Sequence, residues 1–300
     1  MFGRSQVFVP GTMDAVARAA CRRAGMSGDA LEFLRLGQNI LYYLPEAGSV
    51  VRVARDASYR ADAVKEVAVA GWLAEHGVPA ARVFDIGEEQ PLLVEGHPVT
   101  FWHFVPGRVA TGQEASIIGE LLRRLHQLPL PEGIEIPQFD PLDRVRHRIE
   151  QAPIPEQDKR FLAEIQDKLE PALERLPYVL PLGVNHGDAH IKNVIVSSDG
   201  TGTLIDFEAV NAAHHEWDLA KTATEAAMGM LPKGAYERFV AAYGYDLTDW
   251  EGFPTVCSVV QLRMVTWLAQ NIGYSDTIAR EYRKRMRTLR HGLTESWSGF

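Results

Sequence analysis

The alternation of apolar and polar positions divides the chain into a strand-rich first third and a helix-rich remainder. Helical apolar spacing runs over 14–26 and over 59–76, and the second segment ends at Gly77 and Pro79. Short β-prone runs predict strands at 31–36, 39–45, 49–54, 81–87 and 98–105. Together these segments predict a five-stranded antiparallel sheet with one long inserted helix.

Helical patterns dominate from residue 107 onward, with an apolar face at 117–128 and mostly helical spacing over 156–175 and 215–300. One interruption, 193–210, predicts a β-hairpin with a polar turn at Asp199 to Gly202. Because the change of pattern falls at Pro106 and Gly107, we expect an α+β fold of two lobes. The predicted N-terminal lobe covers 1–105 and the predicted C-terminal lobe covers 106–300.

Composition places the chain among ordinary globular proteins, since 46% of its 300 residues are hydrophobic and 23% are charged. A formal net charge of −8 argues against a general nucleic-acid or anionic-membrane binder. The basic run at 280–290 fits a solvated helix better than a partner-binding patch. Cys21 and Cys257 lack CxxC spacing, and no stretch resembles a signal peptide or a spanning helix, so we expect a cytoplasmic protein.

The stretch "NHGDAHIKNVIV", residues 185–196, concentrates the candidate chemistry. On an extended strand His186, Asp188 and His190 would face one side, which is compatible with a zinc site of a metallohydrolase. A second segment, "NAAHHEWDLA", supplies further acids and histidines but has no HExxH spacing. The zinc hypothesis is therefore the less favoured alternative.

A different set of oxygen ligands fits the spacing better. Asp188 precedes Asn193 by five residues, and Asp206 follows at the end of the predicted hairpin. Phosphoryl transfer requires a carboxylate that orients the attacking hydroxyl and hard oxygen ligands for Mg²⁺. A loop, hairpin and loop in this order predict that all three side chains lie at the same end of the hairpin.

"HGDAHIKN" followed by "IDFE" resembles the catalytic loop and metal-binding aspartate of the aminoglycoside phosphotransferase family, whose members are related to protein kinases. The resemblance implies a two-lobed protein-kinase-like fold. It assigns Asp188 to the acceptor hydroxyl and Asn193 and Asp206 to Mg²⁺, while His186 becomes a structural residue of the loop. His190 stands where protein kinases carry a lysine, and it is expected either to contact the γ-phosphate or to stabilise the loop.

The resemblance extends to both flanking regions. The N-terminal lobe should bind the nucleotide through Gly37, Asn39, Arg52, Glu66, Trp102, His103 and Phe104. Arg52 takes the place of the family's usual lysine, with Arg55 as the alternative, and Glu66 matches its acidic partner. Asp218, in "HEWDLAKTA", is expected to bond the catalytic loop, and Glu208 is a further candidate for metal binding.

These features predict a kinase that transfers the γ-phosphate of ATP or GTP, with Mg²⁺, to a hydroxylated small molecule. An aminoglycoside-like or other antibiotic is the favoured acceptor, although the near-balanced charge of the C-terminal lobe fits a polycation poorly. A metabolite kinase of the choline, homoserine or methylthioribose type is the alternative, and a non-catalytic nucleotide-binding protein is a third hypothesis. We expect a monomer or homodimer.

Overall fold

The computed structural model describes residues 8–293 and 295–299. They form two compact units, the first comprising 8–109, 130–136 and 193–210, and the second 110–129, 137–192, 211–293 and 295–299. The hairpin at 193–210 groups with the N-terminal residues because its strands pair there. The boundary expected after residue 105 stays a prediction.

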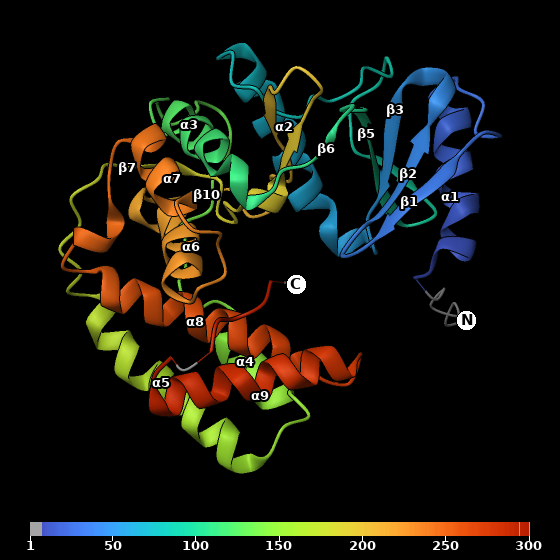
Figure 1. The fold of residues 1–300 in the computed structure, drawn as a ribbon. Coiled ribbons are helices and arrows are strands. Elements are labelled where there is room, and N and C mark those ends of the chain that lie inside the picture. The colour runs from blue at the N-terminus through green and yellow to red at the C-terminus, as the bar shows by residue number, and fades with distance from the viewer. Residues whose placement is uncertain (1–7, 294, 300) are drawn as a thin grey trace. The chain divides into compact units, whose positions relative to one another are not determined.

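The first unit contains the predicted antiparallel sheet, in the order β1-β2-β3-β5-β4 (Figure 1). Its strands are β1 (Glu32–Leu36), β2 (Ile40–Leu44), β3 (Ser49–Val53), β4 (Leu92–Val94) and β5 (His97–His103). Buried and half-buried residues alternate along β2 and β3, as period-2 side-chain geometry requires when one face meets a core. The α+β class and the five-stranded sheet are confirmed.

One predicted strand is wrong. Residues 81–87 form no strand, and only Val83 makes an isolated bridge, to Trp102. The fifth strand is β4, which the tight turn at Glu95 and Gly96 pairs with β5; both turn residues have positive φ, of 50° and 87°. A three-residue strand is too short to show a pattern of alternating apolar and polar residues. The longer apolar run at 81–87 therefore predicted a strand in its place.

Two helices accompany the sheet. Helix α1 (Pro10–Arg23) packs its buried face against β2, β3, β4 and β5, where Met13, Tyr42 and Phe101 share one hydrophobic core (Figure 1). Helix α2 (Arg60–Glu75) contacts β5 and ends before Gly77, whose φ of 68° suits glycine. Both helices fall where the sequence predicted them, within a few residues.

The predicted hairpin at 193–210 is present. Strand β8 (Val194–Val196) pairs with β9 (Gly202–Leu204) on one side and with β6 (Arg108–Val109) on the other. Leu204 also bonds the backbone of Pro79 and Ala81, at 2.9 and 2.8 Å. These bonds fix the start of the segment that carries Asp206.

The second unit is mainly helical, as predicted. Its helices are α3 (Ala115–Leu125), α4 (Val145–Gln151), α5 (Glu156–Leu173), α6 (Glu216–Ala227), α7 (Ala235–Tyr243), α8 (Phe253–Gln270) and α9 (Asp276–His291). A two-stranded ladder, β7 (Leu182–Asn185) with β10 (Asn211–His214), flanks the catalytic-loop segment. The chain therefore enters that segment from β7 and enters α6 from β10.

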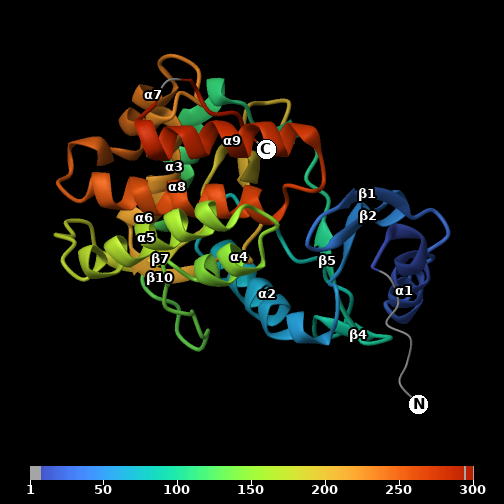
Figure 2. The same ribbon diagram turned by 90° about the horizontal axis from the view of Figure 1, so that it is seen from below.

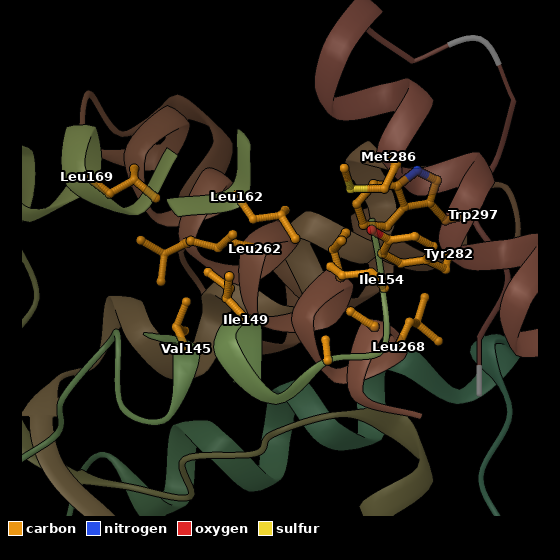
Figure 3. Packing of buried hydrophobic residues seen from close by; sticks show 14 of the residues in the cluster. Val145, Ile149, Ile154, Leu162, Leu169, Leu262, Leu268, Tyr282, Met286 and Trp297 are labelled. Atoms are coloured by element: carbon orange, nitrogen blue, oxygen red, sulfur yellow. The ribbon is translucent and has the colours of Figure 1, made fainter. Parts of the chain in front are cut away.

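The core of the second unit lies around α8, which packs against α4, α5, α6 and α9 (Figure 2). Val145, Ile149, Leu162 and Leu262 meet at one end of this core, and Trp297 packs with Tyr282 and Met286 at the other (Figure 3). In the described part of the chain, no helix combines the length and apolarity needed to cross a membrane.

Candidate active site

The catalytic-loop segment is anchored by one buried carboxylate, Asp218 on α6. Its Oδ2 accepts the backbone N–H of His186 at 2.6 Å, and its Oδ1 accepts that of Gly187 at 2.8 Å. Asp218 is 1% exposed, and Gly187 has a φ of 80°, which favours glycine. The backbone before Asp188 is thus fixed by charge-assisted hydrogen bonds that it donates to a carboxylate on α6, a helix that begins 30 residues after His186.

Asp188 lies between a lysine and a histidine of the same unit. Its Oδ1 is 3.6 Å from Lys221 Nζ, and its Oδ2 is 3.3 Å from His190 Nε2. Burial opposes ionisation, but Lys221 and the hydrogen bond from His190 hold the pKa of Asp188 well below its usual range. Since 48% of the side chain is exposed, the ionised carboxylate remains accessible to a hydroxyl.

The hydrogen bonds of His190 indicate its tautomer. Its Nδ1 accepts the backbone N–H of Lys192 at 3.2 Å, so in the neutral ring the proton sits on Nε2 and points at Asp188. Both ring nitrogens are engaged within the loop. This arrangement favours the loop-stabilising role over the γ-phosphate contact.

A pair of stacked histidines lies behind Asp218. His126 Nε2 bonds Asp218 Oδ2 at 3.0 Å, and its ring stacks on His215 with centroids 3.9 Å apart. His215 Nδ1 bonds Asn185 Oδ1 at 2.7 Å. Burial, followed by the charge of His126, lowers the pKa of His215 to about 4. His215 is therefore neutral near pH 7, which avoids two adjacent positive rings.

In the first unit, Arg52 of β3 forms an ion pair with Glu66 of α2, the pair expected from the family pattern. Arg52 Nη2 also bonds Glu208 Oε2 at 3.3 Å. The Asn39 amide, with its oxygen turned toward Arg52, accepts from Nη2 at 2.6 Å and Nε at 3.0 Å. Burial raises the pKa of Glu66 to about 7, against the opposing effect of Arg52.

Asp206 has the features of a metal ligand. Its φ of 69° is unusual outside glycine, a conformation that tends to occur at functional sites. Among the described residues, its carboxylate accepts no hydrogen bond and forms no ion pair. The carboxylates of Asp206, Glu66 and Glu208 together raise the pKa of Arg52, so negative charge is in excess here. Hard oxygen donors with excess negative charge suit Mg²⁺.

Zinc coordination is not supported. The described residues contain no group of three or more His, Cys, Asp or Glu side chains that could hold a metal ion. His186 Nδ1 instead receives the backbone N–H of Asp188 at 3.4 Å, and His190 bonds Lys192 and Asp188. The histidines that made a zinc site conceivable are part of the loop's own hydrogen bonding.

The remaining predicted nucleotide contacts stay predictions. A Cβ at Gly37 would lie 3.7 Å from Arg35 Nε, an ordinary contact, so the fold itself does not require glycine there. The N–H groups of His103 and Phe104 donate to Arg82 and Gly48 carbonyls, and Trp102 Nε1 donates to Thr100. Because these N–H groups already donate hydrogen bonds within the protein, a hydrogen bond to the edge of a nucleotide base would have to come from other groups of this segment.

Residues 41–253 match the model of the phosphotransferase enzyme family. The chain belongs to this family. An aminoglycoside 3'-phosphotransferase from Streptomyces ribosidificus is 30% identical over 207 residues, which cover 60% of this chain and 73% of that protein. The chain is thus a small-molecule phosphotransferase with an alcohol group as acceptor, and the family resemblance read from its motifs is confirmed.

Solved structures agree on the kinase-like fold of this phosphotransferase. A microcompartment-associated aminopropanol kinase has a TM-score of 0.74 at 19% identity, with coverage of 93% of this chain and 98% of that one. An aminoglycoside phosphotransferase from Streptomyces rimosus has a TM-score of 0.63 at 19% identity, covering 84% and 97%. An amicoumacin kinase in complex with AMP-PNP, Ca²⁺ and Ami has a TM-score of 0.64 at 14% identity, covering 89% and 90%.

Sequence reasoning missed two lysines of this phosphotransferase. Lys221 pairs with Asp188, and Lys65 Nζ donates to the carbonyl oxygens of Glu208 and Val210 at 2.6 and 3.3 Å. One signal was available, because Lys221 follows Asp218 by three residues and therefore shares its face of a helix. Lys65 had no such signal, since it bonds backbone 143 residues away.

Proposed function

We propose that this phosphotransferase transfers the γ-phosphate of ATP or GTP to a hydroxyl of an antibiotic or other small natural product. The observation that carries the proposal is the ionised, half-exposed Asp188, held by Lys221 and His190 on a loop that Asp218 fixes. A carboxylate kept in its charged form by neighbours is the acceptor that an attacking hydroxyl requires.

Asp188 accepts a hydrogen bond from the substrate hydroxyl, orients its lone pair toward the phosphorus and takes the proton late in the reaction. His190 keeps the carboxylate in place through Nε2. Lys221 lowers the basicity of Asp188, so positioning contributes more than proton abstraction. As the P–O bond to the leaving nucleotide breaks, the new bond to the substrate oxygen forms and the hydroxyl proton passes to Asp188.

Arg52 binds the α- and β-phosphates, while Glu66 and Asn39 hold its guanidinium in one orientation. Asn193 and Asp206 would hold Mg²⁺, with Glu208 as a further oxygen donor. When bound, Mg²⁺ neutralises charge on the phosphate oxygens. In its absence, the excess of carboxylates around Arg52 would repel a nucleotide, which supports a metal-dependent reaction.

The second candidate is a metabolite kinase of the choline, homoserine or methylthioribose type. One observation favours its neutral and zwitterionic acceptors, methylthioribose and homoserine, over a polycationic antibiotic. Asp188 Oδ1 lies 3.6 Å from the ammonium group of Lys221 on α6. This cation would repel the ammonium groups of an aminoglycoside, and that of choline, near the reacting hydroxyl.

The test is a screen of hydroxylated antibiotics and metabolites with Mg-ATP and Mg-GTP, read by mass spectrometry for one added phosphate. The wild type should phosphorylate at least one acceptor. Asp188→Asn should lower its kcat by about 10²- to 10⁴-fold, with the nucleotide KM little changed.

A charge-matched control is Asp167→Asn, because Asp167 is 60% exposed on α5 and, among the residues that the structure describes, pairs only with exposed Arg146. This variant should keep wild-type turnover. The proposal fails if no acceptor gains phosphate and nucleotide hydrolysis is equal in the wild type and Asp188→Asn.

A further inference from the structure

Lys65 of helix α2 holds the segment that follows Asp206. Its Nζ donates to the carbonyl oxygen of Glu208 at 2.6 Å and to that of Val210 at 3.3 Å. All of these residues belong to the first unit. We call residues 205–210 the metal loop, because Asp206 is the proposed metal ligand in it. Lys65 thus joins a helix to the backbone of this loop across 143 residues of sequence.

The ammonium group of Lys65 binds backbone oxygens alone. The side chain is half-buried, and in the part of the chain that the structure describes it forms no ion pair. An ammonium group that is partly withdrawn from water depends on the acceptors that the protein supplies. Here two carbonyl oxygens of one short loop are these acceptors, so charge-assisted hydrogen bonds hold the loop backbone.

Asp206 requires such support because its backbone conformation is strained. Its φ is 69°, and a residue other than glycine keeps a positive φ only where the surrounding structure enforces it. On the upstream side, the N–H of Ile205 donates to the carbonyl of Asn193 at 3.0 Å. On the downstream side, Phe207 is buried and Lys65 binds the carbonyls that follow. Without Lys65 the backbone could relax, and the Asp206 carboxylate would turn with it.

The same turn of α2 also places the arginine that is proposed to bind the nucleotide phosphates. The residue after Lys65 is Glu66, which forms the ion pair with Arg52 of β3. Successive residues of a helix point about 100° apart, so Glu66 reaches β3 while Lys65 reaches the metal loop. The side chain of Glu208 links the two parts, since its carboxylate accepts from Arg52 Nη2 at 3.3 Å. Neighbouring residues of α2 therefore position both the phosphate-binding arginine and the metal loop.

We infer that Lys65 is a positioning residue for the Mg²⁺ site, because its bonds to the metal loop hold the carboxylate of Asp206 in place for the metal ion. The inference rests on the proposed binding of Mg²⁺ by Asp206. Lys65 acts through the loop, since the carbonyls of the loop occupy its ammonium group. Its contribution is therefore to the metal-dependent part of the nucleotide affinity, and not to the affinity for the nucleotide alone.

Calorimetry with ADP separates these two contributions. The dissociation constant of ADP is measured in EDTA and with excess Mg²⁺, and the ratio of the first value to the second is the metal gain. Lys65→Met keeps the length of the side chain and removes its donors. The metal gain should fall about tenfold, the factor that one hydrogen bond of a charged donor supplies, while the affinity for ADP in EDTA stays unchanged.

Further variants separate positioning from a general loss of stability. Lys65→Arg keeps a cationic donor and should recover most of the metal gain, and Lys65→Gln keeps a neutral donor and should give an intermediate value. The matched control is Lys159→Met on α5. Lys159 is also half-buried, and its Nζ donates to the carbonyl oxygen of Glu150 at 2.7 Å in the second unit. The control removes the same kind of bond outside the metal loop and should leave both ADP affinities unchanged.

Three outcomes overturn the inference. One is a Lys65→Met variant with the metal gain of the wild type. Another is a loss of ADP affinity that is equal in EDTA and Mg²⁺, or a loss of metal gain in Lys159→Met as well, which a merely structural bond would produce. The third is a wild type without metal gain, since Asp206 then holds no metal. Failure of the proposed function looks different: the metal gain is present and depends on Lys65, but no acceptor gains phosphate.

Discussion

Replacing Asp218 with asparagine tests how the catalytic loop is held. The carboxylate accepts three hydrogen bonds, from the His186 and Gly187 backbone and from His126, and is 1% exposed. An amide has one oxygen. If its NH₂ replaces Oδ1 it faces the Gly187 N–H, and if it replaces Oδ2 it faces the His186 N–H. Either orientation of Asp218→Asn leaves one buried N–H opposite another donor.

The expected cost follows from these contacts. An unsatisfied buried donor costs about 1–3 kcal/mol, and hydrogen bonds to a charged group lose roughly 1 kcal/mol each when the acceptor becomes neutral. Burial by itself would raise the pKa of Asp218. His126, His186 and the loop N–H groups outweigh burial and lower this pKa below its usual value, so the native state favours the anion. Relief of the carboxylate's desolvation offsets part of the loss. We expect Asp218→Asn to lower the free energy of unfolding by roughly 2–4 kcal/mol.

Urea unfolding followed by tryptophan fluorescence measures this change. The second unit contains four of the six tryptophans, Trp217, Trp250, Trp267 and Trp297. The exposed Asp167→Asn change controls for the loss of one negative charge and should cost less than about 1 kcal/mol. A loss for Asp218→Asn no larger than that of the control would refute the anchoring role.

Further predictions concern pH, packing, metal and nucleotide. His215 has its pKa lowered from 6.5 to about 4, so the unfolded chain binds more protons between these values. Stability should be full above pH 6.5 and fall by up to roughly 3 kcal/mol toward pH 4, and His215→Gln should flatten this part of the profile of unfolding free energy against pH. Gly183→Ala would place a Cβ 2.6 Å from His215 Cε1, and thermal melting should show a loss of about 1–3 kcal/mol; an unchanged melting temperature contradicts the packing. Asp206→Asn should raise the Mg²⁺ concentration for half-maximal activity, whereas equal Mg²⁺ titrations would argue against metal binding. Arg52→Lys loses the fork shared by Glu66, Asn39 and Glu208, so the nucleotide KM should rise about tenfold in steady-state kinetics, with an unchanged KM as the contrary result.

The sequence alone located most elements of this phosphotransferase and predicted its chemistry. Hydrophobic periodicity located α1, α2 and the first three strands, because such periodicity is a local property that each element carries by itself. The spacing of Asp188 and Asn193 within one motif, with Asp206 thirteen residues on, indicated phosphoryl transfer for the same reason. Residues that lie on one short stretch of backbone can be recognised from their spacing in the sequence.

Tertiary structure decided which side chains surround those residues. The fifth strand is β4 and not 81–87. Pairing with β5 stabilises β4, whose own hydrophobic pattern is too short to predict a strand. Lys221 Nζ lies 3.6 Å from Asp188 Oδ1 although 33 residues separate the two in the sequence. Charges act through space, so the packing of α6, which carries Lys221, helps to fix the ionisation of Asp188.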